Sequence, residues 1–209
     1  MPDGGALLLF LAAAVLVACS PGPGIFYVAA RTLSGGRGEG LASILGTALG
    51  GLVHVLAGAA GVSALVMASA EAFTALKVAG AIYLLWLGIA TWRSAERMPD
   101  MVAAPGRGCG NALRDGIAVE ALNPKTAAFF LAFLPQFVDP SGSVAAQFIL
   151  LGLISVTLNS LADLVVVHLA ARLRAGVAAR PALLRTLRKA SGAALCALGL
   201  SLALAQRAR

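Results

Sequence analysis

The chain has 209 residues, of which 59% are hydrophobic and 12% are charged, and its mean hydropathy is +0.89. Soluble domains are about one-quarter charged, so this composition excludes a water-soluble surface and indicates a polytopic membrane protein. The net charge of +7 does not predict nucleic-acid binding, because the Lys and Arg residues cluster between apolar runs, where they set membrane topology.

Six segments are long and apolar enough, or nearly so, to cross a bilayer, which takes about 20 residues. We expect spans over 6–30, 41–68, 73–92, 116–138, 144–171 and 190–206. A polar loop over 31–40 is expected between the first two spans. The pattern predicts an all-α integral membrane protein with six transmembrane helices. It forms a single domain over 1–209, with halves at about 1–95 and 110–209 and a linker at about 93–115.

The first span is interrupted by the run Ser20-Pro21-Gly22-Pro23-Gly24. Proline lacks an N–H, so Pro21 frees the carbonyl of Val17 and Pro23 frees that of Cys19. Breaks inside lipid are kept where they line a cavity, because every freed backbone group needs a partner. The helix that restarts also offers unpaired N–H groups at the positive end of its dipole. An amino acid's ammonium suits the carbonyls and its carboxylate the N–H groups, which makes these residues candidate substrate ligands: Pro21, Gly22, Pro23 and Gly24. The alternative is a packing kink.

A matching interruption, Asn123-Pro124-Lys125, lies in the fourth span, where Pro124 frees the carbonyl of Glu120. Pro21 and Phe26 align with Pro124 and Phe129 at an offset of 103, part of a weak repeat between the halves. Three spans per half invert the second half in the membrane. Interrupted helices at corresponding positions of inverted repeats indicate a transporter site. We therefore predict two inverted three-helix repeats and assign Asn123, Pro124 and Lys125 to substrate binding.

Two charged residues flank this second interruption and are expensive in lipid, at about 2.5–3.5 kcal/mol for Lys on insertion scales. Lys125 is expected to neutralise an acidic partner or a substrate carboxylate, and the alternative is that it snorkels to the cytoplasmic face. Glu120 is a candidate proton-coupling group, and a solvated helix end is an equal alternative for it.

The fifth span carries one polar face, because Ser155, Asn159 and Asp163 recur at every fourth residue. Asn159 is assigned to substrate binding. Asp163 is the carboxylate well inside this span, and protonation would remove its burial cost. It is therefore the best candidate for proton coupling or ammonium binding. A structural pair with Lys125 or His54 is the alternative.

His54 lies in the second span among glycines that recur at every fourth residue, which predicts close helix packing around it. The residue is a candidate proton carrier, and a satisfied packing histidine is the alternative. The glycines that share this face are Gly46, Gly50 and Gly58.

Topology is predicted from the distribution of positive charge. Twelve Lys and Arg follow the first, third and fifth spans, whereas three lie on the opposite side. The side with twelve is expected to be cytoplasmic, which places both termini outside, in a bacterial inner membrane.

Enzymatic and metal chemistry find no support in the sequence. The three cysteines, Cys19, Cys109 and Cys196, lie in separate segments without metal-ligand spacing. A zinc-protease helix, a nucleophile elbow and a phosphate-binding loop are missing from the chain. We therefore expect no catalytic residues, no metal and no cofactor.

Several runs of the chain resemble the lysine exporter superfamily, and within it the branch of homoserine and threonine efflux proteins. The matching runs are Pro21-Gly22-Pro23; Gly35-Gly36-Arg37-Gly38-Glu39-Gly40-Leu41; Leu45-Gly46-Thr47-Ala48-Leu49-Gly50; Leu76-Lys77-Val78-Ala79-Gly80-Ala81-Ile82-Tyr83-Leu84-Leu85-Trp86-Leu87-Gly88; Asn123-Pro124-Lys125-Thr126-Ala127-Ala128-Phe129-Phe130; and Leu134-Pro135-Gln136-Phe137-Val138. They cover roughly residues 10–165. Gly24 departs from the pattern, since relatives often carry Asn, Asp or Ala there.

The resemblance implies an exporter of amino acids or close derivatives, driven by the proton gradient as an antiporter. Its partners are a small-molecule substrate and the lipid bilayer. Six spans enclose little volume, so a homodimer is a reasonable expectation. The alternatives are an exporter of metal or other small cations, a membrane-embedded enzyme and a non-transporting subunit.

Overall fold

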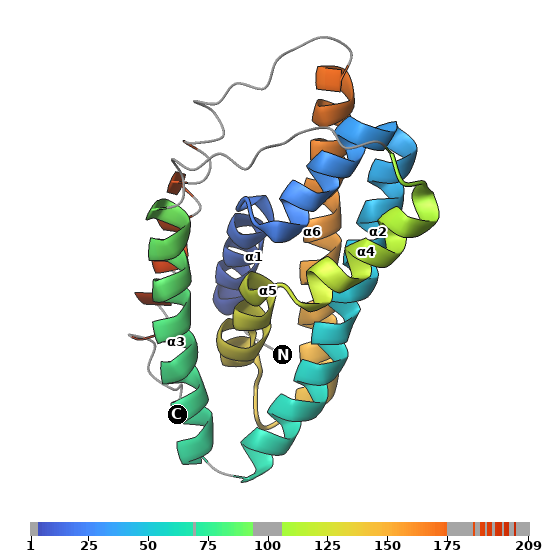
Figure 1. Cartoon of the computed structure of the whole chain (residues 1–209). Coiled ribbons are helices and arrows are strands. Elements are labelled where there is room, and N and C mark those ends of the chain that lie inside the picture. The colour runs from blue at the N-terminus through green and yellow to red at the C-terminus, as the bar shows by residue number, and fades with distance from the viewer. Residues whose placement is uncertain are drawn as a thin grey trace.

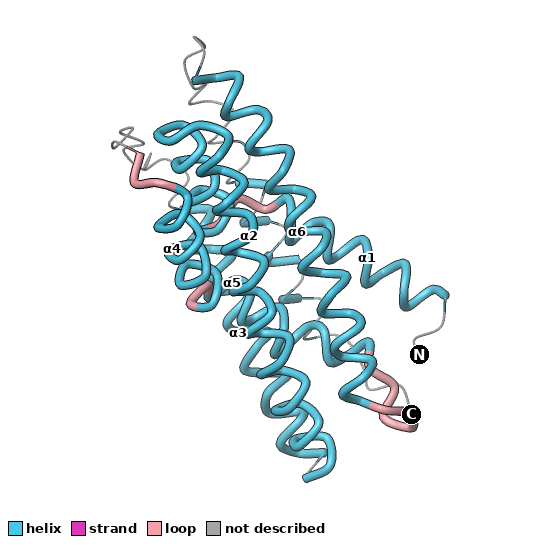
Figure 2. The backbone as a smooth tube through the Cα atoms, turned by 90° about the vertical axis from the view of Figure 1, so that its right-hand side faces the viewer, coloured by secondary structure: helices cyan, strands magenta, loops and turns pink. Residues whose placement is uncertain are grey.

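The computed structural model describes residues 4–68, 70–93 and 106–174, with scattered positions between 186 and 203. The described residues form helices and short connections, without a strand among them, so the all-α prediction is confirmed for this part of the chain (Figure 2). The elements in order are α1 (Gly4–Cys19), α2 (Pro23–Ala68), α3 (Ala70–Arg93), α4 (Cys109–Ala121), α5 (Pro124–Ala128), the π-helix η2 (Phe129–Phe133), the 3-10 helix η3 (Leu134–Phe137) and α6 (Val144–Arg174).

The helices divide into two groups around a central pair. Figure 1 shows α2, α4 and α6 packed together on one side and α3 on the other, with α1 and α5 between them. The described C-terminal positions lie against α3, where a Cβ on Gly88 would come within 2.7 Å of the Gly192 carbonyl. Small residues on both segments therefore allow close approach. The predicted sixth span, 190–206, lies partly outside the described residues.

Helix α2 is interrupted by a sharp kink at Gly36, where φ is 81° and ψ is −169°. Only glycine adopts this region readily, because a Cβ would clash with the backbone. The prediction of a polar loop over 31–40 is wrong, since these residues are helical on both sides of the kink. Continued helix satisfies the backbone internally, and the Thr32 and Ser34 hydroxyls bond the carbonyls of Val28 (2.7 Å) and Arg31 (3.2 Å).

The fourth predicted span is a bent pair of helical segments. Cys109–Ala121 and Pro124–Phe137 meet at an angle of 42°. The first segment begins at Cys109, earlier than the predicted boundary at residue 116. Gly108, with φ 86°, is its N-cap, and this left-handed conformation lets the chain turn directly into the helix.

Two described helices are long and apolar enough to cross a membrane, Pro23–Val62 and Val144–Arg172, and the bent pair would make a third. Large apolar side chains face outward, with Leu8 71% and Leu56 65% exposed. Such a surface suits lipid rather than water. The structure therefore supports an α-helical membrane protein, and the six-span arrangement remains a prediction.

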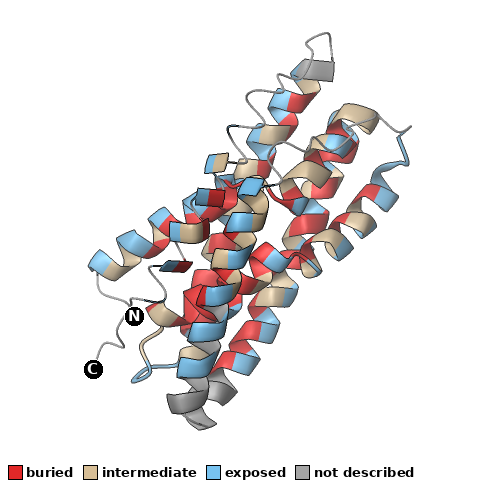
Figure 3. Ribbon diagram, turned by 60° about the vertical axis from the view of Figure 1, so that its left-hand side comes forward, coloured by how far each residue is buried: buried red, intermediate tan, exposed pale blue. Residues whose placement is uncertain are grey.

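Buried residues gather where the helices face one another (Figure 3). Helix α2 packs closely along its glycine face. A Cβ on Gly46 would lie 2.2 Å from the Leu113 carbonyl oxygen, and one on Gly50 would lie 2.6 Å from that of Ile117. The predicted close approach at these glycines is confirmed. Glycine lets α4 lie backbone to backbone on α2.

The turn before α6 is held by its own side chains. The Asp139 carboxylate accepts hydrogen bonds from the Ser141 hydroxyl (2.6 Å) and N–H (2.9 Å), which lower the pKa of this exposed carboxyl. The Gln147 amide reaches back and bonds the Asp139 carbonyl at 2.9 Å. These bonds define the start of α6.

Candidate substrate site

The first break is closed by a side chain from the second. Helix α1 ends at Cys19 and α2 begins at Pro23. The Lys125 ammonium donates to the Val17 carbonyl (3.0 Å) and to the Ser20 carbonyl (2.8 Å). Val17 is the residue whose carbonyl Pro21 deprives of its helical donor. A cation, the protein's own Lys125 ammonium, therefore occupies the carbonyl end of the broken helix.

The second break is closed by the backbone and by His54. The Glu120 carbonyl, which Pro124 leaves without its helical donor, accepts from the Asn123 N–H (3.0 Å) and lies 2.9 Å from His54 Nε2. A carbonyl only accepts, so His54 carries hydrogen on Nε2 in this contact. The Asn123 side chain caps the new helix by accepting from the Lys125 N–H at 3.0 Å.

The Glu120 carboxylate lies between the two helix starts. It accepts hydrogen bonds from the Asn123 amide (2.9 Å) and from the Thr126 hydroxyl (2.6 Å), and the residue is only 3% exposed. A Cβ on Gly24 would lie 2.6 Å from its Oε2 atom. Gly24 therefore makes room for this carboxylate at the first turn of α2, where the helix dipole favours negative charge. A solvated helix end for Glu120 is excluded by this burial.

Lys125 is buried as well, at 5% exposure, and it does not snorkel to a membrane surface. Its side chain crosses Gly22, where a Cβ would lie 3.3 Å from Lys125 Cε. Glu120 and Asp163 both act on its charge. The two breaks thus lie beside each other, joined by the buried Lys125 ammonium, with the buried Glu120 carboxylate between the two helix starts.

Asp163 is fully buried on α6, and only one of its two carboxyl oxygens has a hydrogen-bond partner among the described residues. The Thr47 hydroxyl, from α2, lies 3.2 Å from its Oδ2 atom. Its Oδ1 atom has no hydrogen-bond partner among the described residues. A buried carboxylate with one unpaired oxygen is costly, so uptake of a proton by this carboxyl would remove the cost of its buried charge.

A small cavity of about 30 Å³ separates the breaks from α6. It has room for one or two water molecules and not for an amino acid. Its polar lining comes from four helices and comprises Thr47, Glu120, Thr126, Ser155 and Asn159. Asn159 therefore lines the same cavity as residues of both breaks, while Asp163 does not line it and lies behind Thr47.

Phenylalanine side chains form part of the cavity wall and a cluster beside it. Phe129 lies on its wall and is 6.3 Å from Phe10 and 5.4 Å from Phe133 between ring centroids. Phe137 extends the cluster, 5.1 Å from Phe133. Phe129 and Phe133 belong to the π-helix η2 and Phe137 follows it, whereas Phe10 lies on α1; π-helices often occur at functional sites. The sequence analysis did not assign them a role.

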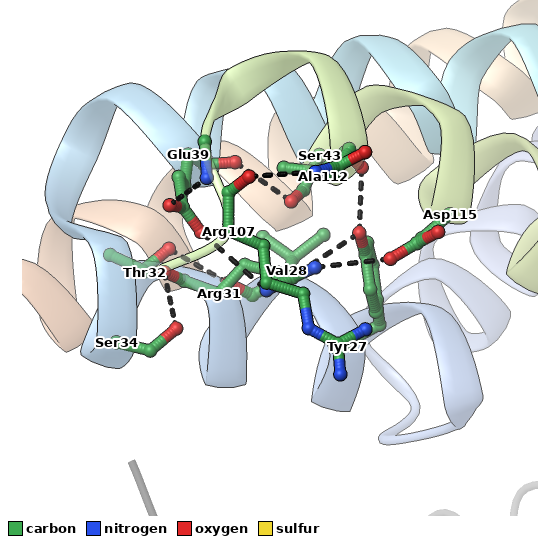
Figure 4. Close-up of polar contacts among 12 residues, drawn as sticks. Tyr27, Val28, Arg31, Thr32, Ser34, Glu39, Ser43, Arg107, Ala112 and Asp115 are labelled. Carbon is green, nitrogen blue, oxygen red and sulfur yellow. Dashed lines mark hydrogen bonds and ion pairs between the residues drawn. The ribbon is translucent and has the colours of Figure 1, made fainter. Parts of the chain in front are cut away.

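A second polar cluster ties α2 to α4 beyond the breaks, and we call it the Arg31 cluster: Tyr27, Arg31, Glu39 and Asp115 (Figure 4). The Arg31 guanidinium bonds the Asp115 carboxylate at 3.0 Å and lies 3.6 Å from that of Glu39. The Tyr27 hydroxyl donates to the Ala112 carbonyl at 2.6 Å.

The Glu39 carboxylate extends this cluster to the chain before α4. It accepts from the Gly108 N–H at 2.7 Å, and a Cβ on Gly106 would lie 2.7 Å from the same oxygen. Glu39 and Arg31 stand on either side of the kink at Gly36, so the kink brings their charges together (Figure 4). Sequence reasoning placed both residues in a loop and missed the cluster. The available signal in the sequence was a pair of opposite charges, Arg31 and Glu39, on either side of Gly35-Gly36, which is typical of a kink that brings them together.

The described fold is that of a helical membrane protein with two adjacent helix breaks. The sequence profile of the LysE type translocators matches residues 15–206. This chain belongs to that family, whose members are transporters and not enzymes.

Several known proteins are similar in sequence over most of the chain. It is 32% identical over 199 residues to the homoserine/homoserine lactone efflux protein of Salmonella typhimurium, covering 95% of this chain and 96% of the relative. An uncharacterized membrane protein of Vibrio cholerae is 32% identical over 166 residues, covering 79% and 81%. The leucine efflux protein of Klebsiella pneumoniae is 29% identical over 136 residues, covering 63% of each. No solved structure matches the chain significantly.

Proposed function

We propose that this protein exports an amino acid or a close derivative across the bacterial inner membrane, coupled to the entry of protons. The observation that carries the proposal is the meeting of two broken helices at one small cavity, whose mostly apolar wall includes five polar residues. There, a cation holds the carbonyl end of one break and a carboxylate lies at the start of the helix after it. Efflux of amino acids or lactones by relatives supports the same class of cargo.

Both breaks present groups that suit an α-amino acid. Freed carbonyls accept from an ammonium, and Lys125 shows that a cation is stable against them. Unpaired N–H groups at the start of α2 suit an anion, and the Glu120 carboxylate lies against that turn. Substrate binding is therefore assigned to Pro21, Gly22, Pro23, Gly24, Asn123, Pro124, Lys125 and Asn159, with selectivity for the cargo residing in the side chains of the cavity wall.

The architecture we propose is six spans in two inverted halves with both termini outside. Helix α1 with the first part of α2 forms the first span, and the bent pair that starts at α4 forms its counterpart. Because the cavity holds only one or two waters, the halves must separate to admit cargo, first on one side and then on the other. The Arg31 cluster would close the cytoplasmic side, and the phenylalanine cluster the outer side.

Proton coupling is assigned to Asp163, with His54 and Glu120 as further members of the relay. Asp163 is buried and has an oxygen without a donor, so a proton there removes the cost of a buried charge. The Glu120 carboxylate accepts from two donors, and His54 binds the Glu120 backbone carbonyl. The hydrogen bonds of Glu120 and His54 would therefore change when the breaks move apart.

The test is an everted-vesicle efflux screen across amino acids and lactones, with and without a proton gradient. Asp163→Asn should insert normally and lose gradient-driven transport, because Asn cannot exchange a proton. Asp139→Asn is the matched control, since that half-buried residue lies in the turn before α6 and does not line the cavity. Undiminished transport by Asp163→Asn would remove this residue from the mechanism. Transport of metal ions in place of amino acids would replace the proposed cargo.

A further inference from the structure

The hydroxyl of Thr47 faces two acceptors and carries one hydrogen. Its Oγ1 atom lies 3.0 Å from the Ile44 carbonyl oxygen and 3.2 Å from Asp163 Oδ2. A hydroxyl donates one hydrogen bond and accepts through its lone pairs. At any moment, therefore, one of these two oxygens receives the Thr47 hydrogen and the other does not.

The protonation state of Asp163 decides which acceptor is satisfied. When Asp163 is ionised, Thr47 donates to Oδ2, and the Ile44 carbonyl goes without this bond. When Asp163 is protonated on Oδ2, the carboxyl donates to Thr47, and the Thr47 hydroxyl turns to Ile44. Both arrangements use the same atoms at the same distances, and they differ only in the direction of the hydrogen bonds.

We propose that Thr47 is a positioning residue that stabilises the ionised form of Asp163 and turns to the Ile44 carbonyl when the proton is taken up. The inference rests on the proposed function, in which Asp163 carries the coupled proton. The charged groups that act on Asp163 from the neighbouring elements are Glu120 on α4 and Lys125 on α5. Thr47 is the donor from α2.

The location of Thr47 joins this switch to the cargo. Thr47 is 1% exposed and lies on the cavity wall, and Asn159 lies on the same wall. Asp163 itself lies behind Thr47 and does not line the cavity. A cargo carboxylate or hydroxyl oxygen that accepts from Thr47 Oγ1 would therefore compete with ionised Asp163 for the single Thr47 hydrogen, so cargo and proton act on the same hydroxyl.

The experiment compares Thr47→Val with Thr47→Ser across pH. Valine has the shape of threonine but cannot donate, so the ionised form of Asp163 loses a hydrogen bond and the proton is held to higher pH. The midpoint of the pH dependence of export should rise by about 1 pH unit, because the hydrogen bond to the charged carboxylate is stronger than the one that the neutral carboxyl donates to Thr47. Serine keeps the hydroxyl and should keep the wild-type midpoint. Thr47→Ala should show the same shift as Thr47→Val if valine impairs insertion.

The matched control is Thr157→Val on α6, whose hydroxyl donates only to the Leu153 carbonyl, at 2.8 Å, on an exposed face. Its midpoint should equal that of the wild type. A second readout is the infrared carbonyl band of the protonated carboxyl in reconstituted protein, assigned by its loss in Asp163→Asn. The band should titrate with the same upward shift in Thr47→Val.

Two outcomes separate this inference from the proposed function. If Asp163→Asn transports with normal pH dependence, the coupling role of Asp163 fails, whatever Thr47 does. If Asp163→Asn abolishes the pH dependence while Thr47→Val lowers the rate without moving the midpoint or the infrared titration, Thr47 only packs against Asp163, and the inference is overturned.

Discussion

Replacing Lys125 by Met tests whether its ammonium holds the two breaks together. The ammonium donates to the Val17 and Ser20 carbonyls, at 3.0 Å and 2.8 Å. Met has a similar length and no charge. In Lys125→Met the Ser20 carbonyl loses this donor, Val17 keeps only the weaker bond from the Ser20 N–H (3.2 Å), and Glu120 loses a nearby positive charge.

The expected loss of stability follows from these contacts. Hydrogen bonds to a charged group contribute about 1.5–3 kcal/mol each, and removing one member of a buried charge pair costs about 3–5 kcal/mol. Part of this is offset because a buried ammonium no longer has to be desolvated. We therefore expect the free energy of unfolding to fall by roughly 2–5 kcal/mol, a range that spans the estimate for lost hydrogen bonds and the estimate for a broken charge pair.

The assay is SDS-induced unfolding of the purified protein in micelles, followed by circular dichroism. Arg37→Met serves as the control, because that cation lies on the exposed side of the kink in α2 and should change the free energy by no more than about 0.5 kcal/mol. An unfolding free energy for Lys125→Met equal to that of the wild type would refute the reasoning. The ammonium would then contribute nothing to the joining of α1 and α5.

Two further predictions concern the contact between α2 and α4. Gly46→Ala places a Cβ 2.2 Å from the Leu113 carbonyl oxygen and should destabilise the protein by about 1–3 kcal/mol. Gly61→Ala is the control, because a Cβ there meets nothing within 4 Å and should not destabilise the protein. Equal unfolding curves for the two variants would contradict the close packing of α2 on α4. Gly38→Cys places a Cβ 3.5 Å from Cys109 Sγ, close enough for a disulfide. The variant is made in a chain whose other two cysteines are replaced by serine. Oxidation should form the disulfide and stop export, and reduction should restore export. Thiol labelling checks the bond, Gly61→Cys is the control, and full export by the oxidised protein would show that these segments do not separate during transport.

Composition and local pattern determined the class of the molecule. Low charge and long apolar runs indicate membrane helices, because lipid tolerates few charges and no unpaired backbone. The breaks at Pro21 and Pro124 were predictable for the same reason, since proline removes a helical hydrogen bond wherever it stands. The close approach at Gly46 and Gly50 also followed from their spacing, because residues four apart share a helix face.

Helix boundaries were less predictable where polar residues interrupt the pattern. Residues 31–40 read as a loop because they combine glycine, serine and charge, yet they continue as helix around Gly36. The decisive contacts come from α4, since Asp115 and the Gly108 N–H pair with Arg31 and Glu39. Local propensity cannot report a partner that lies many residues away in the chain.

The sequence by itself therefore determined that this is a helical membrane protein with two broken spans and a few buried polar residues. Only the tertiary structure decided the partners: that Lys125 reaches the Val17 carbonyl, that His54 binds the Glu120 carbonyl and that Thr47 meets Asp163. The physical reason is the distance along the chain over which each effect acts. Propensity, hydropathy and proline chemistry act within a few residues, whereas each of these hydrogen bonds depends on how separate helices pack.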